Sequence, residues 1–431
     1  MKTMLERGAG ILMPVSSLPS PYGIGTFGKA AYDFVDFLKQ ARQKYWQVLP
    51  VGPTSQGDSP YQSFSAFAGN PYFIDLDTLV GEELLTREEI NACYWGEDET
   101  QVAYDAVFWY RFPLLKKAYA RSEFKEEEGY EKFCMESWYW LNDYAFYMAL
   151  KIHFDNKEWL TWPEDIRFRK KEAMEKYKEE LKDEIEFWKF LQYKFFQQWK
   201  RLRAYANEQG ISIIGDIPIY VALDSSDVWT HPELFLLDEE NLTPIKVAGV
   251  PPDAFSETGQ LWGNPLYRWD MQEKTDFAWW KERMKASARL YDVVRIDHFI
   301  GVVQYYTIPA GAEDGKIGEW MKGPGKKLTD AIDMVIGGTK IIAEDLGISV
   351  PEVKKLLEDT GYPGMKIIEF AFSGDRFNEH LPHMYSPNTV VYGGTHDNET
   401  LVGYFKPEAR QWWELQYIAD YLGVAHQHEV V

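Results

Sequence analysis

The chain has 431 residues and a formal net charge of −21, since 67 acidic residues outnumber 46 Lys and Arg. This balance argues against a nucleic-acid partner and against an anionic membrane surface, because both need a basic surface. No apolar run reaches the 18 residues of a membrane span. Two cysteines, Cys93 and Cys134, cannot form a disulfide framework, so a reducing, cytoplasmic location is expected. The aromatic share, 16%, is the unusual number.

Seven short apolar segments rich in β-branched residues predict buried strands. Between them, amphipathic stretches such as 30–41 and 352–359 predict helices. Strands that alternate with helices are typical of parallel sheets built from βαβ units, so the fold class is α/β. The predicted strands are 10–15, 45–51, 211–220, 293–299, 340–344, 365–372 and 389–393.

A long segment between the second and third strands breaks this alternation. Residues 84–208 are helical in pattern and dense in aromatic and charged residues, which predicts a mostly helical insertion. The Lys/Glu run 170–186 predicts a solvated helix face. The chain therefore divides into 1–83 with two strands, 84–208 as the insertion, and 209–431 with five strands and a glycine- and proline-rich loop at 248–269.

Two motifs that suggest cofactors do not fit their context. Gly23 to Gly28 spells G-x-G-x-x-G, but two prolines separate it from the preceding strand, so a shaped substrate loop is favoured over a dinucleotide site. The eight histidines show no metal-ligand spacing: Pro382 interrupts His380 and His383, and His426 and His428 lie at the chain end. No metal and no cofactor is expected.

Acidic residues follow the apolar stretches of four predicted strands: Asp216 follows 211–215, Asp297 follows 293–296, Glu344 follows 340–343 and Asp397 follows 389–395. One such carboxylate is often only a helix cap, but the carboxyl ends of parallel strands are also where α/β folds place their sites. Paired carboxylates without a metal pattern point to glycoside chemistry, in which one group is ionised and the other protonated.

The neighbours of the paired carboxylates suggest which group takes which state. Arg295 shares a strand face with Asp297 and would keep it ionised, while burial and the adjacent Asp345 would raise the pKa of Glu344.

Carbohydrate would also explain some of the aromatic residues, because sugar rings present apolar C–H faces. Loops 57–70 and 248–269 mix aromatic and polar residues, so Tyr61, Phe255 and Trp262 are predicted to line a glucan cleft. The aromatic residues of 187–199 are predicted to be packing within the insertion.

Seven motifs that run in order through nearly the whole chain resemble glycoside hydrolase family 77, the amylomaltases or 4-α-glucanotransferases. The resemblance implies a TIM (β/α)8 barrel with helical insertion subdomains, in which 248–269 is a lid. The motifs are GILMPVSSLPSPYGIGTFG (10–28), WQVLPVGPTSQGDSPYQSFSAFAGN (46–70), GDIPIYV (215–221), AGVPPDAFSETGQLWGNPLYRW (248–269), RIDHFIG (295–301), IAEDLG (342–347) and THDNET (395–400).

The resemblance also implies residue roles and a reaction. Asp297 matches the nucleophile, Glu344 the acid/base and Asp397 the carboxylate that stabilises the transition state. The implied reaction (EC 2.4.1.25) moves a segment of a 1,4-α-D-glucan to the 4-hydroxyl of an acceptor by a retaining double displacement. Implied partners are maltooligosaccharides, amylose or glycogen-derived glucans, and glucose as acceptor. The implied sugar-binding residues are Tyr61, Asp216, Asp253, Phe255, Gln260, Trp262, Asn264, Arg295, His298 and His396.

Two alternatives share these features: an α-amylase-like retaining hydrolase and a non-catalytic glucan-binding protein. The seven predicted strands are also one fewer than a (β/α)8 barrel needs. The expectation is therefore a chain truncated at its C-terminal end, before the eighth strand.

Overall fold

A computed structural model describes residues 5–55, 57–253, 256–347, 350–406 and 410–424. The chain forms two compact units. The larger comprises Gly8–Val294 and Gly301–Thr339, and the smaller comprises Met1–Arg7, Arg295–Ile300 and Lys340–Val431. Strand β6 begins in the larger unit and ends in the smaller one. In the described residues, no helix is long and apolar enough to cross a membrane.

All seven predicted strands are present, and each is shorter than its predicted apolar segment. They are β1 (Gly10–Leu12), β2 (Tyr45–Gln47), β3 (Ser212–Ile217), β6 (Val293–Ile296), β9 (Lys340–Ala343), β10 (Gly364–Ile367) and β11 (Thr389–Tyr392).

These strands lie in two sheets. The first has the order β1-β2-β3-β6-β9, and β2 pairs in parallel with both β1 and β3, Trp46 lying opposite Ile11 and Ile213. The second is the parallel pair β10 and β11. This confirms an α/β fold with parallel pairing. Closure into a barrel stays a prediction, because the hydrogen-bonded strands of the described residues form separate sheets.

The segment predicted as a lid loop is instead built on strands. Strands β4 (Lys246–Val250) and β5 (Gln260–Pro265) join β7 (Gln304–Pro309) and β8 (Glu319–Lys322) in an antiparallel sheet of order β5-β4-β7-β8. The sequence pattern did not predict these strands, because glycines interrupt β4 and β5. At Gly249 the glycine is needed, since a Cβ there would lie 2.2 Å from the Gln260 carbonyl oxygen.

Helices cover the regions between strands. They are α1 (Lys29–Gln40), α2 (Leu76–Gly81), α3 (Arg87–Asn91), α4 (Tyr104–Arg121), α5 (Glu128–Glu136), α6 (Leu141–His153), α7 (Glu164–Arg167), α8 (Lys171–Glu180), α9 (Lys182–Glu208), α10 (Ser226–Thr230), α11 (Trp269–Lys274), α12 (Ala278–Leu290), α13 (Ile300–Val303), α14 (Lys326–Val335), α15 (Pro351–Thr360), α16 (Leu401–Tyr404) and α17 (Trp412–Leu422).

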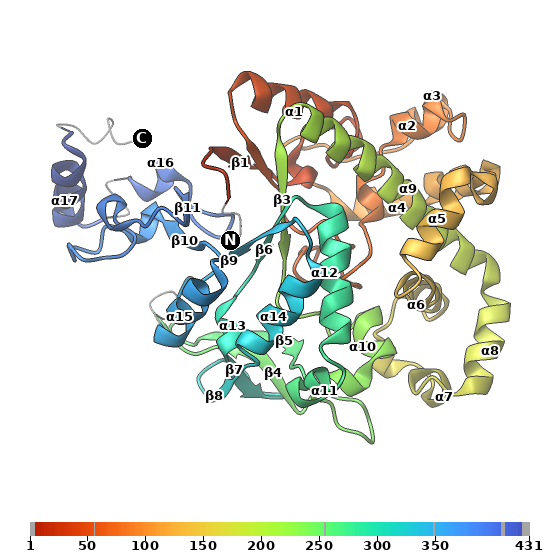
Figure 1. The fold of residues 1–431 in the computed structure, drawn as a ribbon. Coiled ribbons are helices and arrows are strands. Elements are labelled where there is room, and N and C mark those ends of the chain that lie inside the picture. Colours follow the sequence, from red (N-terminus) through yellow and green to blue (C-terminus); the bar gives the residue numbers. More distant parts are fainter. Residues whose placement is uncertain (1–4, 56, 254–255, 348–349, 407–409, 425–431) are drawn as a thin grey trace. The chain divides into compact units, whose positions relative to one another are not determined.

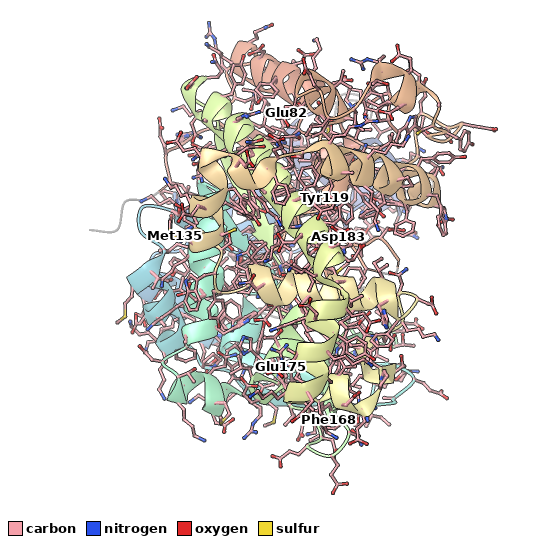
Figure 2. All side chains as sticks on the ribbon, turned by 90° about the vertical axis from the view of Figure 1, so that its right-hand side faces the viewer. Glu82, Tyr119, Met135, Phe168, Glu175 and Asp183 are labelled. Atoms are coloured by element: carbon pink, nitrogen blue, oxygen red, sulfur yellow. The ribbon has the colours of Figure 1, made fainter. Side chains whose placement is uncertain are left out.

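Helices α4 to α9 gather in one region of the larger unit (Figure 1), and the long α9 packs against α6, α4 and α1. Aromatic side chains fill the interior of this region, among them Phe187, Trp188 and Phe195 of α9. At its surface the Tyr119 hydroxyl of α4 donates to Asp183 of α9 at 2.8 Å, and Figure 2 shows the two residues beside each other. Aromatic packing therefore accounts for most of the unusual composition of this segment.

Candidate active site

In the smaller unit, an arginine and a carboxylate meet at the end of β6. Arg295 is the penultimate residue of this buried strand, and Asp297 follows the strand directly. The Arg295 Nη1 atom lies 2.9 Å from Asp297 Oδ1, which is the predicted pairing. Arg295 is buried, while Asp297 keeps part of its side chain exposed. A buried guanidinium stabilises the ionised form of the neighbouring carboxylate, so Asp297 is suited to be the ionised member of a carboxylate pair.

Glu344 follows β9, and its side chain is only 8% exposed. Its Oε2 accepts the His298 N–H at 2.7 Å and its Oε1 accepts the Leu346 N–H at 2.8 Å. Burial raises the pKa of Glu344 above its ordinary value, against the opposing effects of Arg295 and the two backbone N–H groups. Burial is thus the main cause of the raised pKa of Glu344, and the charge of Asp345 makes the smallest contribution to it. Glu344 has the raised pKa that a general acid requires.

Asp345 has a structural role beside Glu344. Its Oδ1 accepts the Met365 N–H at 2.7 Å, at the start of β10. The Ala343 N–H also donates to Pro363 at 3.0 Å, so the end of β9 lies against the residues that begin β10. Glu344 N–H in turn donates to Ile296, at the end of β6, at 3.0 Å. These bonds hold Asp297 and Glu344 at the carboxyl ends of neighbouring strands.

His298 contributes through its backbone as well as its ring. Its φ of 47° is left-handed, a conformation that costs a non-glycine residue energy and often marks a functional site. This turn aims the His298 N–H at Glu344. Desolvation lowers the pKa of the His298 ring to about 4, so the ring is neutral at pH 7. No sequence pattern predicts a left-handed histidine, which is why this backbone role was missed.

Asp397 lies on the loop after β11, and 79% of its side chain is exposed. Its Oδ2 is 3.4 Å from Nε2 of His396. The Asn398 side-chain oxygen accepts from both the N–H and the hydroxyl of Thr395, each at 2.9 Å, which fixes the turn. The THDN motif is therefore a hydrogen-bonded turn that presents His396 and Asp397, and both belong to the same unit as Asp297 and Glu344.

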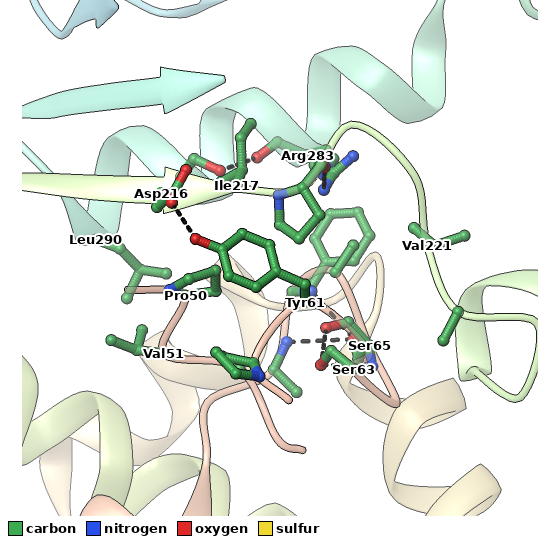
Figure 3. Close-up of a pocket in the computed structure, with 18 of the residues that line it drawn as sticks. Pro50, Val51, Tyr61, Ser63, Ser65, Asp216, Ile217, Val221, Arg283 and Leu290 are labelled. Atoms are coloured by element: carbon green, nitrogen blue, oxygen red, sulfur yellow. Dashed lines mark hydrogen bonds between the residues drawn. The ribbon is translucent and has the colours of Figure 1, made fainter. Parts of the chain in front are cut away.

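In the larger unit, Tyr61 and Asp216 form a pair at the end of β3. The Tyr61 hydroxyl donates to Asp216 Oδ2 at 2.6 Å, as Figure 3 shows, and Asp216 is almost fully buried. Both residues line a cavity of about 50 Å³ whose wall also includes Arg283 of α12. The structure thus joins two predicted sugar-binding residues that are 155 positions apart in the sequence, one on a loop and one on β3.

The lid residues divide into an exposed and a buried set. Gln260 is exposed, and its side-chain oxygen accepts from Trp262 Nε1 at 3.0 Å. Asn264 is only 6% exposed, and its amide donates to the Val221 carbonyl at 2.9 Å and accepts from Gln62 at 3.2 Å. Asn264 therefore ties the lid to two other loops.

The two remaining predicted residues of this segment are Asp253 and Phe255. The side chain of exposed Asp253 accepts the Ser256 N–H at 2.9 Å. The prediction for Phe255 falls outside the described residues.

A second, larger cavity of about 840 Å³ was not predicted from the sequence. The half-buried lid residue Trp262 and the loop residue Gln62 line it together with aromatic side chains of α4 and α9. Its aromatic wall consists of Phe64, Tyr72, Tyr104, Phe108, Phe112, Phe187, Trp188 and Trp262. The helical spacing of Tyr104, Phe108 and Phe112 is the signal that could have suggested it.

The glycines of the 23–28 motif serve packing. A Cβ on Gly25 would lie 1.9 Å from the Val15 carbonyl oxygen, and one on Gly28 would lie 2.0 Å from Asp75 Oδ2. Asp75 lies beside Gly28, accepts from the Thr26 hydroxyl at 2.9 Å and caps the start of α2. In the part of the chain that the structure describes, no group of three or more His, Cys, Asp or Glu side chains could hold a metal ion.

Comparison with known proteins bears on this geometry. The family model described as 4-alpha-glucanotransferase, Glyco_hydro_77, matches residues 13–431. A 4-alpha-glucanotransferase of Clostridium butyricum is 54% identical over 91% of this chain and 81% of its own length. One of Thermus thermophilus is 45% identical over 99% of this chain and 85% of its own length.

Solved structures agree with this relation. An amylomaltase of Streptococcus agalactiae, solved with acarbose, superposes with a TM-score of 0.92 at 43% identity, covering 97% of this chain and 85% of that one. The amylomaltase of Corynebacterium glutamicum, 18% identical with a TM-score of 0.75, shares the fold. The chain belongs to the 4-alpha-glucanotransferase family.

Proposed function

We propose that Asp297, Glu344 and Asp397 perform the glucan transfer of this family by a retaining double displacement. The observation that carries the proposal is the contrast between two carboxyl groups. Asp297 is held 2.9 Å from a buried guanidinium, whereas Glu344 is buried with a raised pKa. A carboxylate paired with a guanidinium and a buried carboxyl group supply the ionised nucleophile and the protonated acid that a retaining mechanism needs.

In the first step, the Asp297 carboxylate attacks the anomeric carbon of the donor sugar. The bond from that carbon to the glycosidic oxygen breaks, and Glu344 gives its proton to the departing oxygen. A covalent glycosyl-enzyme forms and the shortened glucan leaves. Asp397, exposed on its turn beside His396, is assigned to the hydroxyls of the distorted donor sugar, where the interaction strengthens in the transition state.

In the second step, Glu344 is ionised and takes the proton of the acceptor's 4-hydroxyl. The acceptor oxygen attacks the anomeric carbon and displaces Asp297. Two inversions restore the α configuration, and the product is a longer glucan. The backbone N–H groups of His298 and Leu346 stabilise Glu344 in this ionised state, because both donate to its oxygens.

Sugar binding is assigned to the following aromatic and polar groups. Tyr61 with Asp216, and Arg295 with His298 and His396, bind hydroxyls. Trp262 and Gln260 of the lid bind further glucose units, with Asp253 at the lid turn. The 840 Å³ cavity has aromatic walls, as a chain of maltooligosaccharide, amylose or glycogen-derived glucan requires. Asn264 is assigned to lid positioning, since its amide is occupied by Val221 and Gln62.

The test uses α-maltosyl fluoride, a donor whose leaving group needs no proton. Glu344→Gln is expected to lose about 10²–10⁴-fold in transfer from maltotriose. It should still react with the fluoride and accumulate a covalent maltosyl adduct, because the base for the second step is missing. Asp297→Asn should form no adduct. Intact-protein mass spectrometry distinguishes the two.

The adjacent carboxylate provides the control. Asp345→Asn keeps the side-chain oxygen that accepts from Met365 and should leave transfer within a few-fold of the unmodified chain. An adduct on Asp297→Asn, or full transfer by Glu344→Gln, would overturn the assigned roles.

Product analysis separates transfer from the hydrolase alternative. Maltotriose alone should yield glucose and a series of longer maltodextrins, whereas a hydrolase produces only shorter sugars. A binding protein without catalysis leaves maltotriose unchanged. The family assignment favours the transferase outcome.

We place the reaction in the cytoplasm. Cys93 and Cys134, which are the only cysteines of the sequence, are both unpaired, as expected in a reducing compartment. Intracellular fractionation of the native host checks this placement.

A further inference from the structure

Arg283 of α12 is a buried cation that donates hydrogen bonds to backbone carbonyl groups. It is 2% exposed, and its Nη1 donates to the Ile219 carbonyl at 3.1 Å while its Nη2 donates to Pro218. Within the described residues, its Nε has no hydrogen-bond partner and no carboxylate forms an ion pair with it. Burying a guanidinium in this way is costly, so the arrangement calls for a compensating role.

The backbone that Arg283 holds is the loop directly after β3. Asp216, the partner of Tyr61, lies two residues before Pro218, and Asp216, Tyr61 and Arg283 line the same cavity (Figure 3). The hydroxyl of Tyr267, at the end of the lid segment, donates to the same Ile219 carbonyl at 2.9 Å.

Residues of the loop after β3 also contact the lid and hold it in position. The Val221 carbonyl accepts from the Asn264 amide at 2.9 Å. The rings of Tyr220 and Trp262 have centroids 6.3 Å apart, and Tyr220 stacks on Tyr267 at 6.0 Å. A displacement of residues 218–221 therefore moves the lid strand β5.

We propose that Arg283 is a positioning residue that sets how the glycosyl-enzyme partitions between a sugar acceptor and water. The inference rests on the proposed function, because it assumes a covalent intermediate and a lid that holds the acceptor. Positioning of the acceptor raises its effective concentration, and a closed lid excludes water. Arg283 supports both by fixing the loop on which the lid rests.

A second buried arginine offers a matched control. Arg111 of α4 is also fully buried, donates to two backbone carbonyls, those of Ile74 and Tyr22, and lies over the ring of Trp95. Arg283 likewise lies over Trp280. The two guanidinium groups share their chemistry, but Ile74 and Tyr22 lie outside the loops of Tyr61, Asp216 and the lid.

The experiment measures the ratio of transfer to hydrolysis with maltotriose as donor and labelled glucose as acceptor. This ratio does not depend on the fraction of folded enzyme, so a purely structural role leaves it unchanged. Arg283→Lys keeps the charge and loses the forked geometry, and we expect the ratio to fall roughly tenfold with a raised KM for glucose. Arg111→Lys should leave the ratio unchanged.

A milder variant covers the case in which Arg283→Lys does not fold. Tyr267→Phe removes only the hydroxyl that donates to Ile219 and should lower the ratio in the same direction by less. Its control is Tyr144→Phe, because the buried Tyr144 hydroxyl has no hydrogen-bond partner among the described residues.

The outcomes separate the two proposals. If the unmodified chain transfers and both Arg283→Lys and Tyr267→Phe keep its ratio, the role of Arg283 is overturned while the proposed function stands. If the unmodified chain only hydrolyses maltotriose, the proposed function fails and this inference fails with it.

Discussion

At the scale of single residues, the environment of each carboxyl group decides its chemistry. Arg295 lies beside Asp297 and also acts electrostatically on Glu344, lowering its pKa against the effect of burial. The net pKa of Glu344 is still raised, so it stays protonated to a higher pH than an ordinary glutamate. Activity therefore falls at high pH, when Glu344 loses the proton that the first step needs.

The pH dependence of kcat/KM tests this. Arg295→Met removes a positive charge near Glu344, so the pKa of Glu344 rises and the alkaline limb should move to higher pH, at reduced overall activity. Lys366→Met removes a charge that acts on Asp345, and its alkaline limb should stay where it is. An alkaline limb that moves to lower pH in Arg295→Met would contradict the assignment of Glu344.

At the scale of elements, the lid is a strand pair that contacts the segment before β8. The Gly315 N–H donates to the Thr258 carbonyl at 2.9 Å. A Cβ on Gly315 would lie 2.7 Å from the Val250 oxygen and 2.9 Å from the Gln260 nitrogen. Only a glycine allows this close approach, so the segment fixes the position of both lid strands.

Gly315→Ala should force these strands apart and lower the free energy of unfolding by about 1–3 kcal/mol, the usual cost of overpacking. The ratio of transfer to hydrolysis should fall as well, because the lid fits less closely. The control is Gly338→Ala, where an added Cβ meets nothing within 4 Å. Denaturant titration and product chromatography measure both effects, and equal behaviour of the two variants would show that the contact does not matter.

At the scale of the whole molecule, a buried ion pair links the helical region to the loop after β3. Lys151 of α6 is 2% exposed, and its Nζ lies 2.7 Å from Asp224 Oδ2. The Tyr147 hydroxyl and the Trp159 N–H also donate to Asp224, at 2.6 and 3.2 Å. This network gives the loop that carries Tyr220 and Val221 a second anchor, besides Arg283.

Removing one partner of this pair should destabilise the molecule strongly. Lys151→Met leaves Asp224 without its cation and should lower the free energy of unfolding by about 3–5 kcal/mol. The double variant with Asp224→Asn should recover part of that loss. Lys116→Met breaks the exposed pair with Glu184 and should cost at most about 1 kcal/mol. Equal losses in the two single variants would argue against a buried network.

The sequence by itself determined where the seven predicted strands lie along the chain, and it pointed to a pair of carboxyl groups as the candidate site. Apolar runs with β-branched residues are local signals, so all seven parallel strands could be predicted, and Asp297 and Glu344 could be assigned because each follows a strand. The pairing of Arg295 with Asp297 needed only the two-residue period of a strand.

Only the tertiary structure decided which distant loops meet. The lid strands were missed because glycines interrupt β4 and β5, and because β7, which pairs with β4, lies far along the chain. The Tyr61–Asp216 bond, the ties of Asn264 and the buried Arg283 all join residues far apart in sequence. Burial, which raises the pKa of Glu344, likewise depends on the packing of the whole unit, because desolvation is a property of all surrounding atoms.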